Sequence, residues 1–448
     1  MIFRRKASDL LADWKKTWSG KYAALLEGPR RVGKSTIAEE FAKANYRSYI
    51  KVNFAEVGAD VLSVFDSIDN LDDFFLRLQN AARKNLYMHE SVIILDEIQL
   101  QPKVRQAIKH LVSDGRYDYI ETGSLLSIKK NVKNIVIPSE EMKIPVYPMD
   151  YEEFLWAIGS EEAPLLKRIY ESGKPVGQAV NRSKMRSFRT YMAVGGMPQA
   201  VEAYIDKLPF SRIDRIKRTI IDLYEDDFYK IDPSGRISML FESIPSQLAR
   251  TSKSFSLGFA LNKKSRAKDY ELLYDLVNSR TVIPCYNCTD PRVSLSQSRD
   301  PDTFKLYMAD TGLFVSLLLK TGAASEDYLY GKMLSDKLPA NLGFLYENIV
   351  AQTLFSGGNG LYYMTWPKEG STHSYEIDFL ARQGTKTTPL EVKSARTDTH
   401  ASLDEFIRKY SSVVKDPCIL SQKDIGSDGI IRLYPFYLTE FVARQKEQ

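Results

Sequence analysis

The stretch that decides the fold reads Gly28-Pro29-Arg30-Arg31-Val32-Gly33-Lys34-Ser35-Thr36. It matches the phosphate-binding pattern G-x-x-x-x-G-K-[ST]. In such a loop the glycines let the backbone curl until its N–H groups face phosphate oxygens. The lysine reaches the β and γ phosphates, and the serine offers a hydroxyl to Mg²⁺. The sequence therefore predicts that these nine residues bind a nucleoside triphosphate.

The flanking sequence supplies the context that this motif requires. The apolar run at residues 22–26 is typical of a buried strand, and Ile37, Ala38 and Phe41 then recur at helical spacing. A helix that begins at the loop directs the positive end of its dipole at bound phosphate. A strand, a phosphate-binding loop and a helix are therefore favoured over a glycine-rich turn that matches by chance.

Apolar segments of β character alternate with helical segments through the first 160 residues. The five expected strands are residues 22–26, 49–54, 92–95, 118–122 and 144–147. Between them, the apolar residues of segments 71–78 and 104–111 fall on one helical face each. This alternation predicts a parallel sheet covered by helices.

Acidic and hydroxyl side chains follow two of these strands. Asp96 and Glu97 end the third strand at its carboxyl edge, where ligands of open α/β sheets bind. We expect Asp96 to hold Mg²⁺ alongside Ser35, and Glu97 to orient or deprotonate the attacking water. Thr122 and Ser124 end the fourth strand and are candidate sensors of the γ-phosphate. The alternatives are two acids at a solvated strand end and an ordinary Gly-Ser turn.

Four motifs together resemble a family of bacterial and archaeal AAA+-type ATPases. They are the loop at residues 28–36, Ile-Leu-Asp-Glu-Ile-Gln at 94–99, Thr-Gly-Ser at 122–124 and Tyr-Pro-Met-Asp-Tyr-Glu-Glu-Phe at 147–154. The resemblance implies a sheet of order 5-1-4-3-2, ATP as the nucleotide, and a C-terminal domain with a restriction-endonuclease-like end. Relatives often carry a Gly-Arg pair before the fifth strand, whereas this chain has Ser-Glu-Glu-Met-Lys at 139–143.

The middle of the chain is expected to be mainly helical. Gly-Gly-Met-Pro at residues 195–198 predicts a turn between two helices of a lid. Residues 241–287 are interpreted as a winged helix, with helices at 241–250 and 269–278, a strand at 281–286, and the basic turn Asn-Lys-Lys-Ser-Arg at 262–266. Such a unit could contact DNA. A solvated charged face on a helical module is the alternative.

Three acidic positions near the C-terminus have the order and spacing of the PD-(D/E)xK nuclease core. Glu347 lies in a helical run, Asp378 ends the segment Tyr-Glu-Ile-Asp at 375–378, and Glu391 and Lys393 follow a turn expected at residues 383–387. The resemblance implies that the three carboxylates bind Mg²⁺ at a scissile phosphate and that Lys393 positions the attacking water. A sheet edge with charged ends is the alternative.

Composition sets wider limits. With 448 residues, two or three domains are expected. The net charge of +5 neither requires nor excludes a nucleic-acid partner. We expect a cytoplasmic location without membrane contact, because no stretch approaches a membrane span. Cys285 and Cys288 form a C-x-x-C without a second ligand pair, so ordinary thiols are favoured over zinc.

These observations combine into one interpretation. The fold class is α/β, with an AAA+-like core at 1–160, a helical lid and winged-helix region at 161–330, and a small nuclease-like α/β domain at 331–448. The function predicted is Mg²⁺-dependent ATP hydrolysis coupled to DNA handling, with further copies of the chain as candidate partners. The alternative is a nucleotide-gated switch or scaffold whose C-terminal half binds DNA or a protein without cleaving it.

Overall fold

The computed structural model divides the chain into two compact units. Unit 1 comprises residues 1–147 and 278–280, and unit 2 comprises residues 148–277 and 281–448. The structure describes residues 1–66, 68, 70–124, 138–250, 254–262, 264, 266–320, 326–335, 342–394 and 397–443. The domain limits expected from the sequence at 160 and 330 stay a prediction.

Unit 1 is a parallel sheet with helices on both faces. Its strands are β1 (Ala23–Gly28), β2 (Ser48–Asn53), β3 (Ser91–Asp96), β4 (Asp118–Ser124) and β5 (Glu141–Pro145). Its described helices are α1 (Lys6–Trp18), α2 (Lys34–Asn45), α3 (Ala59–Leu62), η1 (Ser63–Asp66), α4 (Leu71–Ala82), η2 (Ile98–Leu100) and α5 (Pro102–Asp114).

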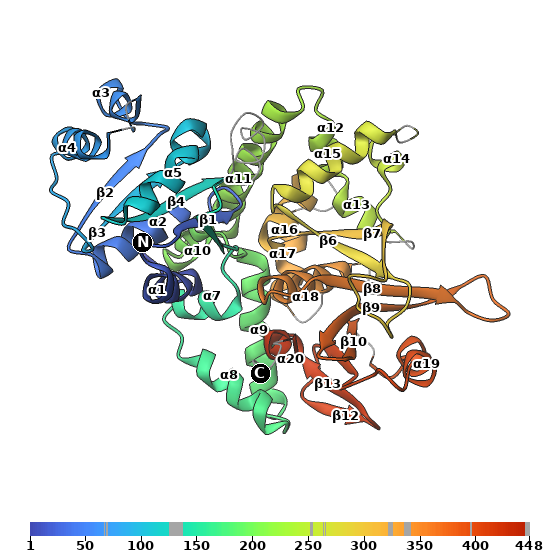
Figure 1. Ribbon diagram of the computed structural model, residues 1–448. Coiled ribbons are helices and arrows are strands. Elements are labelled where there is room, and N and C mark those ends of the chain that lie inside the picture. Colours follow the sequence, from blue (N-terminus) through green and yellow to red (C-terminus); the bar gives the residue numbers. More distant parts are fainter. Residues whose placement is uncertain are drawn as a thin grey trace. The chain divides into compact units, whose positions relative to one another are not determined.

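The strand order of this sheet is β2-β3-β4-β1-β5, and all four pairings are parallel. Read from its other edge, this is the order 5-1-4-3-2 that the resemblance implies. Apolar residues of α4 and α5 form one core with alternate residues of β1, β2 and β3. Helix α2 packs against β1–β4 without contributing to that core and so covers the opposite face (Figure 1). The predicted α/β core is confirmed.

One strand begins earlier than the sequence predicts. We expected residues 144–147, whereas β5 runs from Glu141 to Pro145 and pairs with β1 from Ala23 to Glu27. An edge strand has a neighbour on one side only, so its side chains are partly exposed and need not be apolar. Because β5 starts with polar residues, a search for hydrophobic runs does not detect its first residues.

A carboxyl group lies buried in the middle of this sheet. Glu121 of β4 is fully buried, and neither of its carboxyl oxygens has a hydrogen-bond partner within the described structure. Burial raises the pKa of Glu121 well above its ordinary value, and the Glu141 carboxylate raises it further. Glu141 itself is held by Arg105, whose Nη2 lies 2.6 Å from Glu141 Oε2. Glu121 is therefore protonated in the folded protein at pH values where the unfolded chain has lost that proton.

Glu121→Gln should stabilise the protein increasingly as the pH rises. Below the pKa of the unfolded side chain both states hold the proton, so the substitution has little effect on the free energy of unfolding. Above it, folding of the parent requires proton uptake, so stability falls with pH, and glutamine removes this dependence. We expect Glu121→Gln to melt a few degrees above the parent at pH 8 and less so at pH 5. Thermal melts of both proteins and of Glu90→Gln, an exposed control, measure this; a pH-independent difference would contradict it.

Unit 2 contains the larger part of the chain. Its strands are β6 (Val282–Cys288), β7 (Arg299–Met308), β8 (Leu361–Pro367), β9 (Ser374–Gln383), β10 (Lys386–Lys393), β11 (Cys418–Ser421), β12 (Gly426–Asp428) and β13 (Ile431–Pro435). Its first helices are α7 (Tyr151–Ala157), α8 (Glu162–Ser172), α9 (Gln178–Val194), α10 (Pro198–Ile205), α11 (Phe210–Ile231), α12 (Arg236–Glu242), α13 (Ile244–Leu248), α14 (Leu257–Ala260) and α15 (Ala267–Asn278). The others are α16 (Thr311–Lys320), α17 (Glu326–Leu334), α18 (Phe344–Ser356), α19 (Ala401–Lys409), η4 (Phe436–Leu438) and α20 (Thr439–Ala443).

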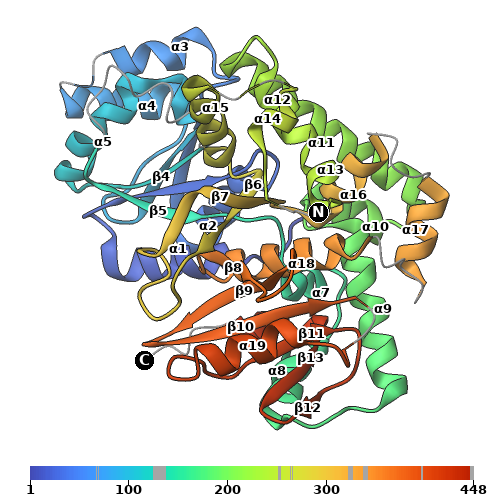
Figure 2. The ribbon, with the colours of Figure 1, turned by 90° about the vertical axis from the view of Figure 1, so that its right-hand side faces the viewer.

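The strands of unit 2 form one mixed sheet of order β12-β13-β11-β10-β9-β8-β6-β7. The elements α18, β8, β9, β10, α19 and β11 follow one another along the chain; β8, β9 and β10 pair antiparallel, and β10 pairs with β11 in parallel. Helices α18 and α19 lie on opposite faces of this part of the sheet (Figure 2). The strand at 281–286, which we assigned to the winged-helix region, is β6; it pairs with β7 and continues the same sheet through β8.

The expected turn at residues 195–198 is the point where two backbone segments of unit 2 meet. Helix α9 ends at Val194 and α10 begins at Pro198. A Cβ atom added at Gly312 would lie 2.4 Å from the Cα of Gly195, so neither position has room for a side chain. The buried Asp310 accepts hydrogen bonds from the N–H groups of Gly196 (2.6 Å) and Leu313 (2.8 Å). The glycine pair therefore serves close backbone packing as well as the turn.

Two further expectations concern the thiols and the membrane. Cys285, Cys288 and Cys418 are free and buried. Among the described helices, none combines the length and the apolar character needed to cross a bilayer.

Candidate functional site

The phosphate-binding loop joins β1 to α2 as the sequence predicts. Gly33 precedes the helix with φ +94°, and Arg31 also has a positive φ of 70°. A Cβ atom at Gly28 would lie 2.0 Å from the carbonyl oxygen of Val146, so only glycine permits this approach of loop and chain. No side chain caps α2 in the described structure, so the first N–H groups of this helix can face an anion.

Lys34, the invariant lysine of the motif, is folded back onto its own loop. It is 7% exposed, and its Nζ donates to the carbonyl oxygens of Gly28 (3.0 Å) and Pro29 (2.8 Å). These contacts hold the ammonium inside the loop, beside the helix N-terminus, where phosphate binding by this motif requires a positive charge.

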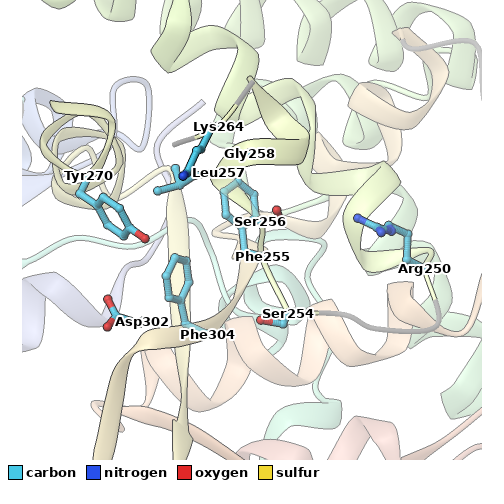
Figure 3. A pocket seen from close by; sticks show the side chains of 10 residues that line it. All are labelled: Arg250, Ser254, Phe255, Ser256, Leu257, Gly258, Lys264, Tyr270, Asp302 and Phe304. Atoms are coloured by element: carbon cyan, nitrogen blue, oxygen red, sulfur yellow. The ribbon is translucent and has the colours of Figure 1, made fainter. Parts of the chain in front are cut away.

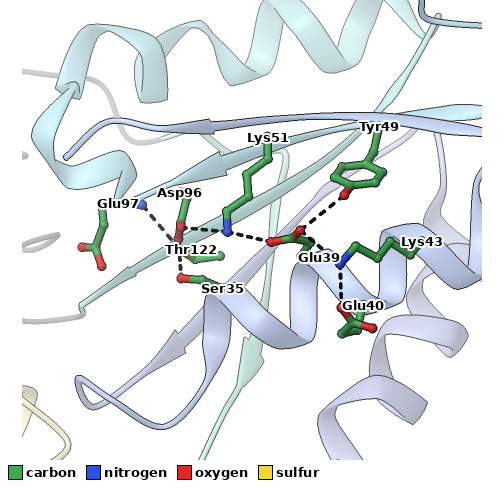
Figure 4. Close-up of polar contacts among 9 residues, drawn as sticks. All are labelled: Ser35, Glu39, Glu40, Lys43, Tyr49, Lys51, Asp96, Glu97 and Thr122. Atoms are coloured by element: carbon green, nitrogen blue, oxygen red, sulfur yellow. Dashed lines mark hydrogen bonds and ion pairs between the residues drawn. The ribbon is translucent and has the colours of Figure 1, made fainter. Parts of the chain in front are cut away.

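Asp96 is the centre of a hydrogen-bond cluster at the end of β3. Its Oδ1 accepts from Ser35 Oγ at 2.7 Å and also from the hydroxyl of Thr122 (Figure 4). The carboxylate is 3% exposed. Ser35 lies in the first turn of α2, and Thr122 lies on β4, so three elements bring their polar groups to one point. A carboxylate and a hydroxyl side by side are the donors with which P-loop proteins hold Mg²⁺.

Glu97 lies next to this cluster but points elsewhere. It has a left-handed backbone, φ 58°, and its carboxylate accepts from Gln99 Nε2. Figure 4 shows the Glu97 side chain directed away from Asp96. Its backbone N–H lies 3.4 Å from Thr122 Oγ1. A positive φ in a residue other than glycine is uncommon and costs conformational free energy, and it is found at functional sites. Gln99 was absent from our sequence prediction, although it belongs to the quoted Ile-Leu-Asp-Glu-Ile-Gln motif.

Of the two residues expected to sense the γ-phosphate, the structure describes the side chain of Thr122 but not that of Ser124. Thr122 joins the Asp96 cluster. The backbone of Ser124 continues β4 and pairs with Gly28, but its side chain lies outside the described parts. The role of Ser124 stays a prediction.

A lysine that the sequence did not identify extends the cluster. Lys51 lies on β2, the strand next to β3, and its Nζ is 3.7 Å from Asp96 Oδ2 and 2.9 Å from Glu39 Oε2 (Figure 4). Alternation along β2 places Lys51 on the opposite face from the buried Ile50 and Val52. Sequence alone could assign the face but not the neighbour, because the distance to Asp96 depends on the pairing of β2 with β3.

Arg5 is a second residue that the sequence prediction missed. It is 4% exposed, and its guanidinium donates to the carbonyl oxygen of Val32 (2.8 Å, from Nη1) and to that of Tyr147 (2.7 Å, from Nη2). One side chain thus ties the phosphate-binding loop to the segment after β5. The basic start of the chain gave no signal for this role, because Arg4 and Lys6 flank Arg5 and are equally basic.

Arg5→Met should weaken nucleotide binding. The substitution leaves two carbonyl groups without their charged donor, and each lost bond of this kind costs about 1.5–3 kcal/mol. Part of this free energy should be lost from phosphate binding, because the loop is no longer held in place. We expect the affinity for a fluorescent ATP analogue to fall roughly tenfold, which corresponds to about 1.4 kcal/mol. Arg4→Met, at an exposed neighbouring position, is the matched control. Equal affinities of the parent and Arg5→Met would refute the role of Arg5.

The C-terminal residues that we predicted to share a metal lie on α18, β9 and β10. The expected hairpin is present, with Gly384 at φ +61° in its turn, and Leu390 pairs with Phe379, so Glu391 and Asp378 follow directly. The pairs Tyr362–Leu380 and Met364–Ile377 enclose a bulge, because β9 advances three residues there while β8 advances two. Bulges re-aim side chains and occur next to functional sites.

Each of the predicted metal ligands has a donor from the protein. Glu347 Oε2 lies 3.4 Å from the Tyr307 hydroxyl, and Asp378 Oδ2 accepts from the backbone N–H of Val392 at 2.8 Å. Glu391 Oε1 lies 2.6 Å from Lys393 Nζ. Burial raises the pKa of Glu391, and Lys393 opposes that rise.

These carboxylates do not form a common metal shell. Throughout the described residues, no three or more His, Cys, Asp or Glu side chains are grouped so that they could hold a metal ion. One oxygen of Glu391, Oε2, is buried without a hydrogen-bond partner there, but the other two ligands do not converge on it. The side chains present therefore do not fit the predicted nuclease metal.

A buried lysine lies among the carboxylates instead. Lys305 of β7 is fully buried, and its Nζ is 2.7 Å from Glu376 Oε1. Burial works to lower the pKa of Lys305, but the neighbouring carboxylates, foremost Glu376 and Glu347, raise it overall. Our sequence prediction gave Lys305 no role.

A pocket of about 570 Å³ is lined by the region that we interpreted as a winged helix together with β7 (Figure 3). The predicted helix at 241–250 is two short helices, α12 and α13, which meet at Ser243. Residues 263 and 265 of the basic turn lie outside the described residues. Basic and aromatic side chains line the pocket together, among them Arg250, Lys264, Phe255, Tyr270 and Phe304.

Three family models match parts of the chain. Residues 20–155 match the AAA domain, residues 185–324 match a domain of unknown function (DUF8612), and residues 342–435 match a second domain of unknown function (DUF4143). A search of curated proteins found no match.

Several solved structures are similar to the chain. The Walker-type ATPase of Pyrococcus abyssi is 16% identical, with a TM-score of 0.42, and the match covers 70% of this chain and 96% of that one. Cdc6p from Pyrobaculum aerophilum is 13% identical over 74% of this chain and 93% of that one, with a TM-score of 0.25. Drosophila ORC bound to DNA is 13% identical over 71% of this chain and 96% of that one, with a TM-score of 0.26. Residues 20–155 thus match the AAA domain, and their strand order and phosphate-binding loop agree with that match.

Proposed function

We propose that this protein binds ATP with Mg²⁺ in unit 1 and hydrolyses it. The observation that carries this proposal is the meeting of Ser35, Asp96 and Thr122 beside the phosphate-binding loop. Such a cluster supplies the ligands of the metal ion, and the loop supplies N–H groups and the ammonium of Lys34 for the phosphates. Bound Mg²⁺ would neutralise charge that develops on the phosphate oxygens.

Each residue of this site has a separate role in hydrolysis. Ser35 and Asp96 would hold the metal ion and Lys34 would contact the phosphates, while Thr122 keeps the Asp96 carboxylate in place. Glu97 orients the water and accepts its proton as the water oxygen bonds to the γ-phosphorus. The bond between that phosphorus and the β-γ bridging oxygen breaks, and ADP leaves. Gln99 holds Glu97 aside until nucleotide binding reorders this segment.

Glu97→Gln should retain ATP and lose hydrolysis. The amide keeps the shape of the side chain but cannot accept the proton, so kcat is expected to fall about 10²–10⁴-fold while ATP affinity changes little. Phosphate release and equilibrium binding of an ATP analogue measure the two effects separately. Glu56→Gln, at an exposed position of the same unit, is the control. Undiminished turnover in Glu97→Gln would remove Glu97 from the role of base.

We further propose that unit 2 handles DNA. Two cationic side chains, Arg250 and Lys264, lie with exposed Tyr270 around one pocket, which suits phosphate contacts beside a stacked base (Figure 3). The ATPase would then couple nucleotide state to DNA contact. The second candidate, a switch or scaffold that binds without cleaving, is favoured by the mismatch between the C-terminal carboxylates and a metal shell.

DNA binding through this pocket should depend on salt and on its two cations. We expect the double substitution Arg250→Ala, Lys264→Ala to weaken binding of single-stranded DNA and to reduce the slope of log affinity against log salt by about 1–2, because each phosphate contact releases roughly one counterion. Fluorescence anisotropy at several salt concentrations measures both quantities. Lys174→Ala, at an exposed position elsewhere in unit 2, should leave the slope unchanged. The pocket would be excluded as the DNA site if the parent protein bound no DNA. It would also be excluded if the double variant had the same salt slope as the parent.

A further inference from the structure

Unit 2 carries its own cation where the nuclease resemblance places a metal ion. We propose that the Lys305 ammonium takes the place of the divalent cation among Glu347, Glu376 and Asp378, so that unit 2 binds its partner without metal-dependent cleavage. This proposal rests on the proposed DNA handling by unit 2 and specifies that unit 2 binds DNA without cleaving it. It does not depend on ATP hydrolysis in unit 1.

The first support is the position of the lysine. Lys305 is 0% exposed, and its Nζ forms an ion pair of 2.7 Å with Glu376 Oε1 on β9. The carboxylates of Glu347 and Asp378 also lie within electrostatic reach of this ammonium. The ring of Tyr363 lies beneath it, with its centroid 4.6 Å from Nζ. A charge buried this completely is stable only where opposite charges surround it.

The second support is the way the carboxylates are divided. Glu347 and Asp378 lie within electrostatic reach of Lys305, whereas Glu391 is paired with a different lysine, Lys393. The predicted metal ligands are thus divided between two ammonium groups. This division explains why the described residues contain no metal-binding group at this point, although the expected residue types are all present.

The chemistry of the two cations explains why they exclude each other. Mg²⁺ requires near-octahedral oxygen ligands at short distances and retains some of its water. A buried ammonium at the same carboxylates occupies that space and repels a second positive charge. Removal of the ammonium would leave the buried Glu347 and the partly exposed Glu376 and Asp378 without their positive charge, and these carboxylates would then gain by taking up a divalent cation.

The test is a titration of the full-length protein with Mn²⁺ alone. All proteins carry Asp96→Asn, so that the P-loop site in unit 1 does not contribute. Isothermal calorimetry of this parent should show no saturable Mn²⁺ site, and Mn²⁺ should leave its melting temperature unchanged. Lys305→Gln should bind one Mn²⁺ at least about tenfold more tightly than the parent and melt at a higher temperature when the ion is added. Lys386→Gln, an exposed lysine on β10, is the matched control and should behave as the parent does.

Two further variants make each outcome decisive. Lys305→Arg keeps the positive charge and should remain without Mn²⁺, whereas Lys305→Gln with Asp378→Asn should lose the ion that Lys305→Gln gains. A parent that binds one Mn²⁺, and loses it on Asp378→Asn, would overturn the proposal whether or not Lys305→Gln folds. ATP turnover, measured with Asp96 intact, reports on the function of unit 1, and its failure would leave the Mn²⁺ result unaffected.

Discussion

The hydrogen bonds that Ser35 and Thr122 donate to Asp96 are the interaction on which the candidate ATPase site depends. They join the first turn of α2, the end of β3 and the end of β4 at one carboxylate oxygen. That oxygen is almost fully buried, and a buried carboxylate without donors would be costly. The same contacts therefore stabilise the edge of the sheet and prepare the site before any ligand is bound, which is the preorganisation that phosphoryl transfer requires.

The loop itself depends on contacts that its motif does not contain. Gly28 lies against the Val146 carbonyl, and Arg5 binds the carbonyl oxygens of Val32 and Tyr147. The loop is thus fixed by the start of the chain and by the segment after β5. Because β5 is an edge strand next to β1, the sheet order determines that these distant segments reach the loop.

Unit 2 shows how the same residue types can serve different chemistry. Helix α18 carries Glu347, strand β9 carries Asp378, and strand β10 carries Glu391 and Lys393, the residues for which the resemblance implied a nuclease site. The chemistry differs through one side chain from β7, because Lys305 places an ammonium among carboxylates that a metal ion would otherwise share. The likeness of a fold therefore does not decide its function, which depends on which charges meet in the site.

The sequence by itself determined the local features of this protein. Residues 28–36, the acids after the third strand and the alternating apolar segments were enough to predict the parallel α/β core and, through the family resemblance, its strand order. These predictions succeeded because spacing along one strand or helix dictates which side chains share a face or an end. Tertiary structure alone decided which distant residues meet: Arg5 with the loop, Lys51 with Asp96, Glu121 in a dry sheet interior, and Lys305 with the C-terminal carboxylates. Those contacts depend on strand pairing and burial between segments far apart in the chain, and no local pattern records them.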